Sequence, residues 1–343
     1  MKDSLPLVTV IVVTLNNLNL LRNCLRSLHD QDYAAIKIVV VDNGSNEDIG
    51  GMLSTEFPDV RMIRLYKNHG FAGGNNRGIE TAQGDYVALI NNDAVAAPTW
   101  LSSLVATAES DPKIGAVASI IIDGNCPEVL DSCGVGIALD GMSRQAMRGN
   151  PVPELTQPKE VLLFSGCACL LRMEALKSVG LFDENFFAYC EDTDLGLRIR
   201  RAGWKIVVAP NAYVEHYYSM TVGKFSLQKV YFVERNHFWV AIKNFPWFLL
   251  LMVPLFTAIR YFFQGYSISK GIGELNKFTG NNEMPAIAST FIKAYVNMFK
   301  KLPAMLSKRR AFHKKHHLGN IDMFCLIWKF HLTINEIIGA SDR

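Results

Sequence analysis

Two short acidic segments contain the residues best suited to chemistry on a phosphorylated substrate. The first, Leu89–Asp93 (LINND), closes the apolar run Tyr86–Ile90, a pattern typical of a buried strand followed by a polar turn. The second, Tyr189–Asp194 (YCEDTD), precedes a basic segment with a helical pattern. Ligands of open α/β sheets bind beyond the carboxyl ends of the strands, so Asp93 is well placed to hold a metal ion and phosphates. A second carboxylate at the same edge can act as a base, and this pairing indicates group transfer from a phosphorylated donor.

The elements that must position these acids alternate between strand and helix patterns over the first hundred residues. Strands are expected at Val8–Val13, Ile36–Val41, Val60–Leu65 and Tyr86–Ile90, with helices at Leu18–Leu28 and Phe71–Thr81. This spacing predicts right-handed βαβ units and a mainly parallel sheet. Residues 122–160, rich in Gly, Asp and Pro, are expected to form an irregular surface excursion, and Val161–Leu171 a further strand.

Charge divides the chain of 343 residues into two parts. Residues 1–225 carry a net charge of −7 and residues 226–343 a net charge of +10, so we predict a catalytic domain over 1–225 and a basic, apolar helical region over 226–343. No apolar signal segment with a cleavage site is visible, so secretion is not expected. The seven cysteines form no paired CxxC motifs, which favours reduced thiols in a cytosol and argues against a zinc site.

The carboxyl-terminal part combines apolar and basic segments. The run Phe245–Ile259 is uncharged, contains Pro254, and is shorter than the roughly 20 residues needed to span a bilayer. Seven Lys and Arg residues follow within Lys300–Lys315, and no acid lies between Glu283 and Asp322. This combination favours a protein lying on an anionic membrane surface. A soluble helical subdomain with a solvated basic face, and a true transmembrane span, remain alternatives. A nucleic-acid binder is disfavoured because no reading module is visible.

Two common phosphate-binding motifs are absent. Neither the turn Thr14–Asn17 nor the glycine-rich stretch Asn68–Gly78 has the GxGxxG spacing of a Rossmann dinucleotide site. The sequence also contains no GxxxxGK[ST], which excludes a P-loop.

The ordered set of motifs resembles the inverting family 2 glycosyltransferases, most closely their rhamnosyltransferase-like branch. The motifs that carry the resemblance are Val10–Asn17, Val39–Ser45, Asn68–Gly78, Leu89–Asp93, Gly180–Glu184 and Glu191–Leu195. The resemblance covers roughly residues 6–240. It implies a GT-A fold, which is an α/β, Rossmann-like arrangement of a mainly parallel mixed sheet with flanking helices. To this the C-terminal sequence adds a helical, membrane-associating region.

The resemblance implies a nucleotide-sugar site at the ends of the first two strands. Asp42 matches the family's aspartate that contacts the base, while its alternative role is to cap the following helix. Thr14 and Asn16 would line the same pocket. Asn75 and Arg77, near the start of a helix, would meet the nucleotide, although Arg77 is equally compatible with an ordinary surface position.

The metal site is expected at Asp93, the one acid that the segment Asn91–Asp93 keeps of the family's DxD-like motif. A hard cation, Mg²⁺ or Mn²⁺, suits Asp93 together with diphosphate oxygens and water, and would neutralise charge on the departing nucleoside diphosphate. Asn92 is assigned to nucleotide-sugar binding. His216 matches a family position where histidine completes the metal shell or contacts the diphosphate, and a purely structural histidine is the alternative. Tight metal binding without the donor is not expected.

The catalytic base implied by the resemblance is Asp192, the second acid of the Glu-Asp pair. In an inverting transfer, a carboxylate takes the proton of the acceptor hydroxyl as the new bond forms. Glu191 and Asp194 would support it by orienting neighbours or by pairing with Arg198 or Arg201. The alternative is an acidic helix start that the helix dipole stabilises, which suits Asp194 in any case.

The resulting function hypothesis is transfer of a hexose, with L-rhamnose from dTDP-L-rhamnose as the candidate, to a lipid-linked saccharide. The product would feed O-antigen, capsule or another cell-surface polysaccharide at the cytoplasmic face of a bacterial inner membrane, with the protein bound peripherally or monotopically. One alternative is a polyprenyl-phosphate sugar synthase, and another is a non-catalytic membrane-bound nucleotide-sugar sensor or scaffold. A processive synthase is disfavoured because the sequence contains no QxxRW and no set of spanning helices.

Overall fold

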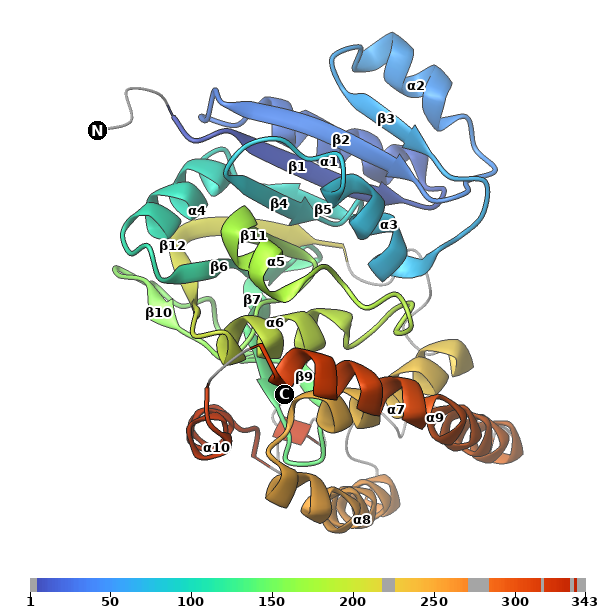
Figure 1. Cartoon of the computed structure of the whole chain (residues 1–343). Coiled ribbons are helices and arrows are strands. Elements are labelled where there is room, and N and C mark those ends of the chain that lie inside the picture. The colour runs from blue at the N-terminus through green and yellow to red at the C-terminus, as the bar shows by residue number, and fades with distance from the viewer. Residues whose placement is uncertain (1–4, 218–225, 271–283, 316–317, 334–335, 338–343) are drawn as a thin grey trace.

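The computed structural model describes residues 5–217, 226–270, 284–315, 318–333 and 336–337. Over these residues the chain builds a sheet with helices on both faces and a group of helices from the C-terminal third packed beneath it (Figure 1). The molecule is thus an α/β protein with a helical extension.

The amino-terminal half of the sheet forms as the sequence predicts. Its parallel strands are β1 (Val8–Thr14), β2 (Ile36–Asp42), β3 (Arg61–Arg64) and β4 (Tyr86–Ile90). They are connected by helices α1 (Leu18–His29), α2 (Ile49–Glu56) and α3 (Gly70–Ile79). The order β3-β2-β1-β4 directs the carboxyl ends of all these strands to one edge of the sheet. Residues that follow the strands therefore meet at that edge, which is called the carboxyl edge below.

The second half makes the sheet mixed. It comprises β5 (Ala94–Ala96), α4 (Trp100–Glu109), β6 (Ile114–Asp123), β7 (Cys126–Cys133), β8 (Val135–Ile137), β9 (Ser143–Gln145), β10 (Lys159–Glu160), β11 (Ala168–Arg172), α5 (Met173–Val179), α6 (Glu191–Arg201) and β12 (Lys205–His216). Strand β11 lies antiparallel between β4 and β6, and β12 continues the sheet parallel to β6.

The expectation of an irregular surface excursion over residues 122–160 is wrong. Strand β7 pairs with β6, strands β8 and β9 form a small sheet of their own, and Leu130, Cys133 and Ile137 are buried. The Gly-rich and Asp-rich composition reflects the turns between these short strands. The strand expected over Val161–Leu171 begins only at Ala168, and the residues before it are buried with little strand pairing.

Alternating side chains of the central strands supply two apolar layers. Val8, Val10 and Val12 of β1 pack with residues of α1 and α4 on one face. Ile11 faces the opposite side, where α3, α5 and α6 cover the sheet (Figure 1). A strand buried on both faces reads as a continuous β-branched run, which is why β1 was recognisable in the sequence.

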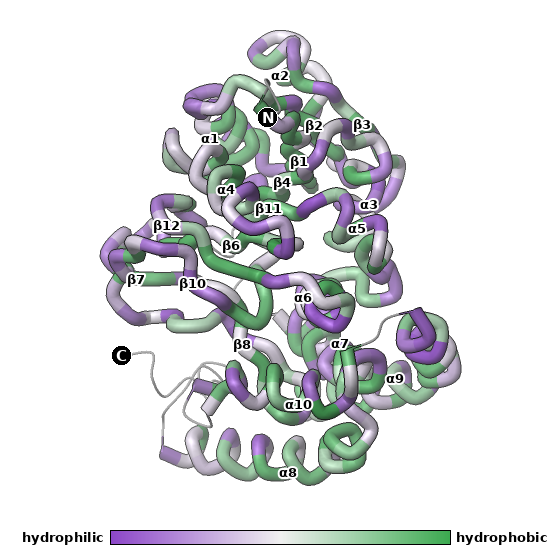
Figure 2. Tube along the Cα trace, turned by 60° about the vertical axis from the view of Figure 1, so that its left-hand side comes forward, coloured by the Kyte–Doolittle hydropathy of each residue, from purple (hydrophilic) through white to green (hydrophobic). Residues whose placement is uncertain are grey.

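The C-terminal helices are α7 (Leu227–Asn244), α8 (Trp247–Ser269), α9 (Met284–His313) and α10 (Asn320–Lys329). A third apolar cluster joins them to the sheet region: Trp239 and Met305 pack together with Ile137, Leu163 and Leu197. The hydropathy colours of Figure 2 show α8 as largely hydrophobic, interrupted by paler and hydrophilic positions. The boundary expected after residue 225 precedes α7 and follows residues 218–225, which lie outside the described residues. The division into a catalytic domain over 1–225 and a helical region over 226–343 stays a prediction.

Candidate active site

The carboxyl edge brings the first predicted residues together. Thr14 at the end of β1 is in register with Asp42 at the end of β2. Asn92, in the turn after β4, donates a side-chain hydrogen bond of 3.0 Å to the Thr14 hydroxyl. Three segments far apart in the sequence thus contribute neighbouring polar groups, because they follow adjacent parallel strands.

Asp42 has one oxygen committed to the fold and one available. Its Oδ1 accepts a hydrogen bond of 2.8 Å from the Ser45 backbone N–H, so the capping role is present. Its Oδ2 is buried without a hydrogen-bond partner among the described residues, and the nearest cation, Arg64, lies 3.7 Å away. Buried carboxylate oxygens normally accept hydrogen bonds, so Oδ2 has capacity for a ligand donor.

Asn16 is held by the turn after β2. Its backbone has a positive φ of 62°, its N–H donates to the Ser45 hydroxyl, and its Oδ1 accepts from the Asn46 N–H. Asparagine tolerates this left-handed conformation better than most residues. Asn16 therefore joins the two turns that border the predicted nucleotide pocket.

Helix α3 approaches the site closely at its first residue. Gly70 has a φ of 71°, and a Cβ there would lie 2.2 Å from the carbonyl oxygen of Phe187, so this position accepts only glycine. Asn75 is buried and donates to the Phe71 carbonyl. Arg77 lies in the last turn of α3 and not near its start as expected. It forms ion pairs with Glu184 at 3.0 Å and with Glu80 at 3.5 Å, and neither is a predicted site residue.

The metal candidates meet where β12 passes the turn after β4. His216 is in register with Ala94, and its Nε2 lies 3.4 Å from Oδ1 of Asp93, an oxygen that makes no well-formed hydrogen bond. On its other side, His216 Nδ1 contacts Oδ2 of Asp131 at 2.8 Å. Burial disfavours the charged imidazole, yet Cys167, Asp131 and Asp93 together raise the pKa of His216 well above its ordinary value.

These residues fit a divalent cation that a diphosphate helps to bind. Asp93 and His216 offer one oxygen and one nitrogen, and a carboxylate behind a metal-binding histidine, such as Asp131, is a common orienting partner. Within the described ranges, no group of three or more His, Cys, Asp or Glu side chains is arranged to hold a metal ion alone. Substrate oxygens would therefore have to complete the shell of Mg²⁺ or Mn²⁺.

Asp192, in the first turn of α6, is partly exposed and firmly oriented. Its Oδ2 accepts from the Gly166 N–H at 3.0 Å and its Oδ1 from the Thr193 N–H at 2.7 Å. Burial raises the pKa of Asp192 although these backbone donors oppose the shift. Glu191 is more deeply buried, its Oε2 has no described partner, and burial followed by the charge of Asp192 raises the pKa of Glu191 well above its usual range.

Asp194 is the structural acid of this segment. It contacts Arg198 at 2.9 Å, one of the two pairings considered, whereas Arg201 donates instead to backbone carbonyls of Asn244 and Leu318. A further partner is Lys243 of α7, whose Nζ lies 2.8 Å from Asp194. Burial acts to raise the pKa of Asp194, but Lys243 and Arg198 hold it below its ordinary value.

A short path of backbone contacts joins the two acids of the central hypothesis. Beyond β4, the Asn91 N–H donates to the Cys167 carbonyl at 2.8 Å, and β11 continues from there antiparallel to β4. Gly166, the residue before Cys167, donates to Asp192. Asp93 therefore lies in the turn that follows β4, and Asp192 contacts the turn that precedes β11. Both turns lie at the carboxyl edge of the sheet.

The segments around Asp192 and Ser165 also contact strand β9, which the sequence did not predict. The Thr193 hydroxyl donates to Ser143 of β9 at 2.8 Å, and Gln145 donates to Ser165. Asp131 comes from β7, in the stretch expected to be irregular. Only the alternation of small and polar residues in that stretch could have revealed the pairing of β7 with β6, and this alternation is too short to be distinctive.

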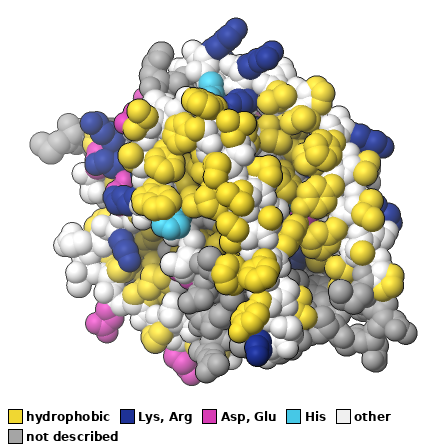
Figure 3. Space-filling view, turned by 90° about the horizontal axis from the view of Figure 1, so that it is seen from below, with side chains coloured by type: hydrophobic (Ala, Val, Ile, Leu, Met, Phe, Trp, Pro, Cys, Tyr) yellow, Lys and Arg dark blue, Asp and Glu magenta, His cyan; other side chains and the backbone are white. Residues whose placement is uncertain are grey.

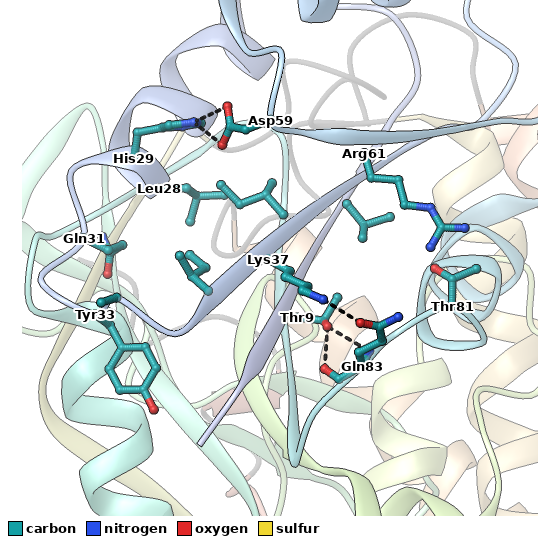
Figure 4. A pocket seen from close by; sticks show the side chains of 14 residues that line it. Thr9, Leu28, His29, Gln31, Tyr33, Lys37, Asp59, Arg61, Thr81 and Gln83 are labelled. Atoms are coloured by element: carbon teal, nitrogen blue, oxygen red, sulfur yellow. Dashed lines mark hydrogen bonds and ion pairs between the residues drawn. The ribbon is translucent and has the colours of Figure 1, made fainter. Parts of the chain in front are cut away.

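An open hollow of about 530 Å³ lies at the opposite edge of the sheet (Figure 4). It is lined near the amino ends of β1 and β2 by residues that include Thr9 and Lys37. Polar groups there satisfy one another: His29 contacts Asp59 at 3.1 Å, and Lys37 donates to Gln83. None of the predicted site residues lines this hollow, so it is not part of the candidate site.

Solved structures share this architecture. A fragment of S. aureus TarS in complex with UDP matches 94% of this chain and 90% of its own length, with a TM-score of 0.53 and 18% identity. GalNAc-T7 with UDP, GalNAc and Mn²⁺ matches 71% of this chain and 52% of its own, with a TM-score of 0.55 and 18% identity. The likeness concerns the fold, and the class that fold and carboxyl edge define is the GT-A type of α/β protein.

The chain belongs to glycosyl transferase family 2, whose family model matches residues 9–180. It is 30% identical over 247 residues to the N-acetylglucosaminyl-diphospho-decaprenol L-rhamnosyltransferase of Mycobacterium tuberculosis, a match that covers 65% of this chain and 79% of that relative. It is 28% identical over 226 residues to the O-antigen biosynthesis protein RfbC of Myxococcus xanthus, covering 62% of this chain and 17% of RfbC. The family resemblance inferred from the motifs is confirmed.

Another relative, the uncharacterised protein y4gI of Sinorhizobium fredii, is 30% identical over 236 residues, which is 64% of this chain. The matched part spans only 25% of y4gI, as it spans only 17% of RfbC. Those two relatives are thus much longer than the shared glycosyltransferase region.

Proposed function

We propose that the protein is an inverting, metal-assisted hexosyltransferase that moves a sugar from a nucleoside diphosphate to a hydroxyl of a lipid-linked saccharide. The first donor to test is dTDP-L-rhamnose, because an L-rhamnosyltransferase is among the relatives. The observation that carries the proposal is the pair of acids at one edge of the sheet: Asp93 beside His216, and Asp192 with a raised pKa.

Asp192 is the proposed base. Its two backbone hydrogen bonds fix the carboxylate, and its raised pKa makes it a better proton acceptor than an exposed aspartate. The acceptor oxygen forms a bond to the anomeric carbon as its proton passes to Asp192. The bond from that carbon to the diphosphate oxygen breaks on the opposite face, and the nucleoside diphosphate leaves with the electron pair.

On the donor side, Asp42 Oδ2 is proposed to accept a hydrogen bond from the base or ribose, beside Thr14 and Asn16. Asn75, Arg77 and Asn92 complete the proposed nucleotide-sugar contacts. Asp93 and His216 would hold Mg²⁺ or Mn²⁺, which supplies charge neutralisation for the departing diphosphate when bound. Two of the similar solved structures contain Mn²⁺, one with UDP and one with GDP-Man, which supports this choice of cofactor.

The proposed acceptor and the proposed location are supported by the names of the relatives and by the C-terminal sequence. One relative acts, by its name, on a diphospho-decaprenol-linked sugar, and another belongs to O-antigen biosynthesis. Helix α8 is long and apolar enough by length and composition to cross a membrane, which alone is weak support for membrane association. We place the protein at the cytoplasmic face of a bacterial inner membrane, in cell-surface polysaccharide synthesis.

A thermal-shift screen of nucleoside diphosphates and their sugars, with Mg²⁺ or Mn²⁺, tests the donor. Selective stabilisation by one nucleotide identifies the base, and a further shift with one sugar form identifies the donor. Transfer is then assayed with a polyprenyl-diphosphate-sugar and, in parallel, with polyprenyl phosphate. The proposal expects product only from the first acceptor; product only from the second would assign a polyprenyl-phosphate sugar synthase instead.

A further inference from the structure

Large apolar side chains are exposed mainly on three C-terminal helices. The exposed ones on α8 are Trp247, Leu251, Met252, Leu255, Phe262 and Tyr266; on α9 they are Ile292, Val296, Phe299 and Leu306; on α10 they are Ile321 and Trp328. Among the described residues the exceptions are Leu5, Tyr66 and Leu227. Figure 3 views the molecule from below and shows hydrophobic side chains spread across this side, with Lys and Arg mostly toward its margin. These twelve residues are called the apolar face.

Helix α8 has the reverse of the pattern expected for a surface helix. Its buried side contains the polar residues Thr257, Arg260 and Ser267 next to Leu249 and Val253, whereas its outward side carries large apolar residues such as Leu255 and Phe262. Only 22% of its most apolar stretch is buried within the protein. A soluble surface helix turns its apolar side inward, so the outward side of α8 is built to contact something apolar.

Buried ion pairs hold α8 against the rest of the protein. Arg260 contacts Asp140 at 2.6 Å and Glu234 of α7 at 3.1 Å, and the neighbouring Tyr261 hydroxyl donates to Glu234 at 2.7 Å. For α8 to cross a bilayer, this cluster would have to break or enter the hydrocarbon, where charged groups are costly. The helix therefore fits a position parallel to a membrane rather than across it.

The charge around the apolar face selects the partner. Helix α9 contains no acid, and Lys293, Lys300, Lys301 and Arg310 are exposed along it. A second copy of the chain placed on this face would bring two basic margins together, which is unfavourable. Anionic lipid headgroups around an acyl-chain interior match both the charge and the apolar centre.

We infer that the apolar face docks the protein in the plane of an anionic bilayer, with α8 lying in the interface and not crossing it. This inference adds a docking surface and an orientation to the membrane location given in the proposed function. It rests on the proposed function only for the biological role of the docking. It also defines how the site meets a membrane-anchored acceptor.

The same helices fix the position of the segment that contains Asp192 relative to the apolar face. Lys308 of α9 contacts Asp183 at 2.5 Å, and Lys243 of α7 bridges Asp183 and Asp194, both at 2.8 Å. Asp194 lies in the same helical turn as Asp192. The apolar face and the proposed base thus belong to one connected body, so docking would present the acceptor saccharide to Asp192 at a fixed distance from the lipid.

Flotation of the full-length protein with vesicles tests the docking face. We expect the wild type to float with phosphatidylcholine vesicles that contain phosphatidylglycerol, and the Leu255→Asp/Phe262→Asp variant to bind at least about tenfold more weakly. The matched control is Tyr66→Asp, because Tyr66 is 98% exposed but lies outside the apolar face. Lys300→Gln should weaken binding about fivefold, with Lys67→Gln as its control.

Three results of this experiment would overturn the inference. They are failure of the wild type to float, equal flotation of the double variant, and a wild-type dimer that the double variant converts to a monomer, which would assign the face to a second copy. Nucleotide-induced thermal shifts are measured on the same samples. Loss of nucleotide binding with intact flotation would count against the proposed function and leave the docking face standing.

Tryptophan quenching by brominated lipids tests the orientation of α8. In a Trp328→Phe background, Trp247 is the probe at one end of the helix; Phe262→Trp in a Trp247→Phe/Trp328→Phe background is the probe about four turns away. The Trp247→Phe/Trp328→Phe variant gives the signal of Trp100, Trp204 and Trp239, which is subtracted from both. An in-plane helix predicts similar, shallow depths for both probes. One deep and one shallow probe would show that α8 inserts across the bilayer and would contradict the inference.

Discussion

The carboxyl edge of the sheet and the C-terminal helices depart from the usual distribution of residues in opposite ways. The edge keeps carboxylates inside the protein, and the helices keep large apolar side chains outside it. Buried carboxylate oxygens without a hydrogen bond and broad exposed apolar surface both cost stability, so each is retained for a reason other than folding. The carboxylate oxygens of the edge indicate a place for a polar ligand, and the exposed apolar side chains of the helices indicate a place for an apolar partner.

The two regions also differ in how they satisfy buried charge. Among the described residues, the carboxylate oxygens buried without a hydrogen bond belong to Asp42, Asp93 and Glu191, all near the carboxyl edge. In the helical region, the buried ions Arg260 and Lys243 have carboxylate partners within 3 Å. The buried ions of the helices are therefore paired, whereas the edge has carboxylate oxygens without hydrogen bonds, which suit a nucleotide and a cation.

The strongest test of the connection between the regions is Lys243→Met. It leaves Asp183 and Asp194 buried without their shared cation, so the free energy of unfolding should fall by about 3–5 kcal/mol. Urea unfolding measures this change. The control is Lys205→Met, whose half-exposed pair with Asp111 should cost about 0–1 kcal/mol. Equal, small losses for both variants would mean that Lys243 does not join the regions.

A smaller effect is expected at the carboxyl edge from Asp131→Asn. It weakens the group that orients His216, and the affinity for Mn²⁺ in the presence of nucleotide should fall about 10–100-fold. Calorimetric titration measures it, and nucleotide binding without metal should not change. Asp111→Asn serves as a surface control. Unchanged Mn²⁺ affinity would assign His216 to a structural role.

The smallest expected change is a gain in stability from Glu191→Gln. A carboxyl group whose pKa is raised in the folded state costs stability at every pH above its unfolded pKa, because folding then opposes ionisation. Glutamine removes this cost, so the free energy of unfolding at pH 7 should rise by ~1 kcal/mol, and the difference should vanish below pH ~4. Thermal unfolding at several pH values measures it, with the exposed Glu80→Gln as control. Destabilisation at pH 7 would show that Glu191 makes a stabilising contact.

Much of the sheet could be predicted from the sequence, as could the positions of Asp42 and Asp93 at the carboxyl ends of its strands. The strand β1 is a β-branched run and the turn after β4 is polar, so their types and positions follow from local pattern alone. Asp131 and Lys243 could not be found in this way, because the first reaches the site through pairing of β7 with β6 and the second through packing of α7 on α6. Nor does sequence show that the apolar side of α8 faces outward, since a buried helix has the same composition.

The most direct test of the central claim compares Asp192→Asn with wild type in sugar transfer and in donor binding. The account predicts that kcat falls by about 10²–10⁴-fold while the donor-induced thermal shift is unchanged, and that the acid limb of wild-type kcat/KM lies above the pKa of an ordinary aspartate. Glu191→Gln should retain far more activity. A kcat for Asp192→Asn within about tenfold of wild type would contradict the assignment of Asp192 as the base.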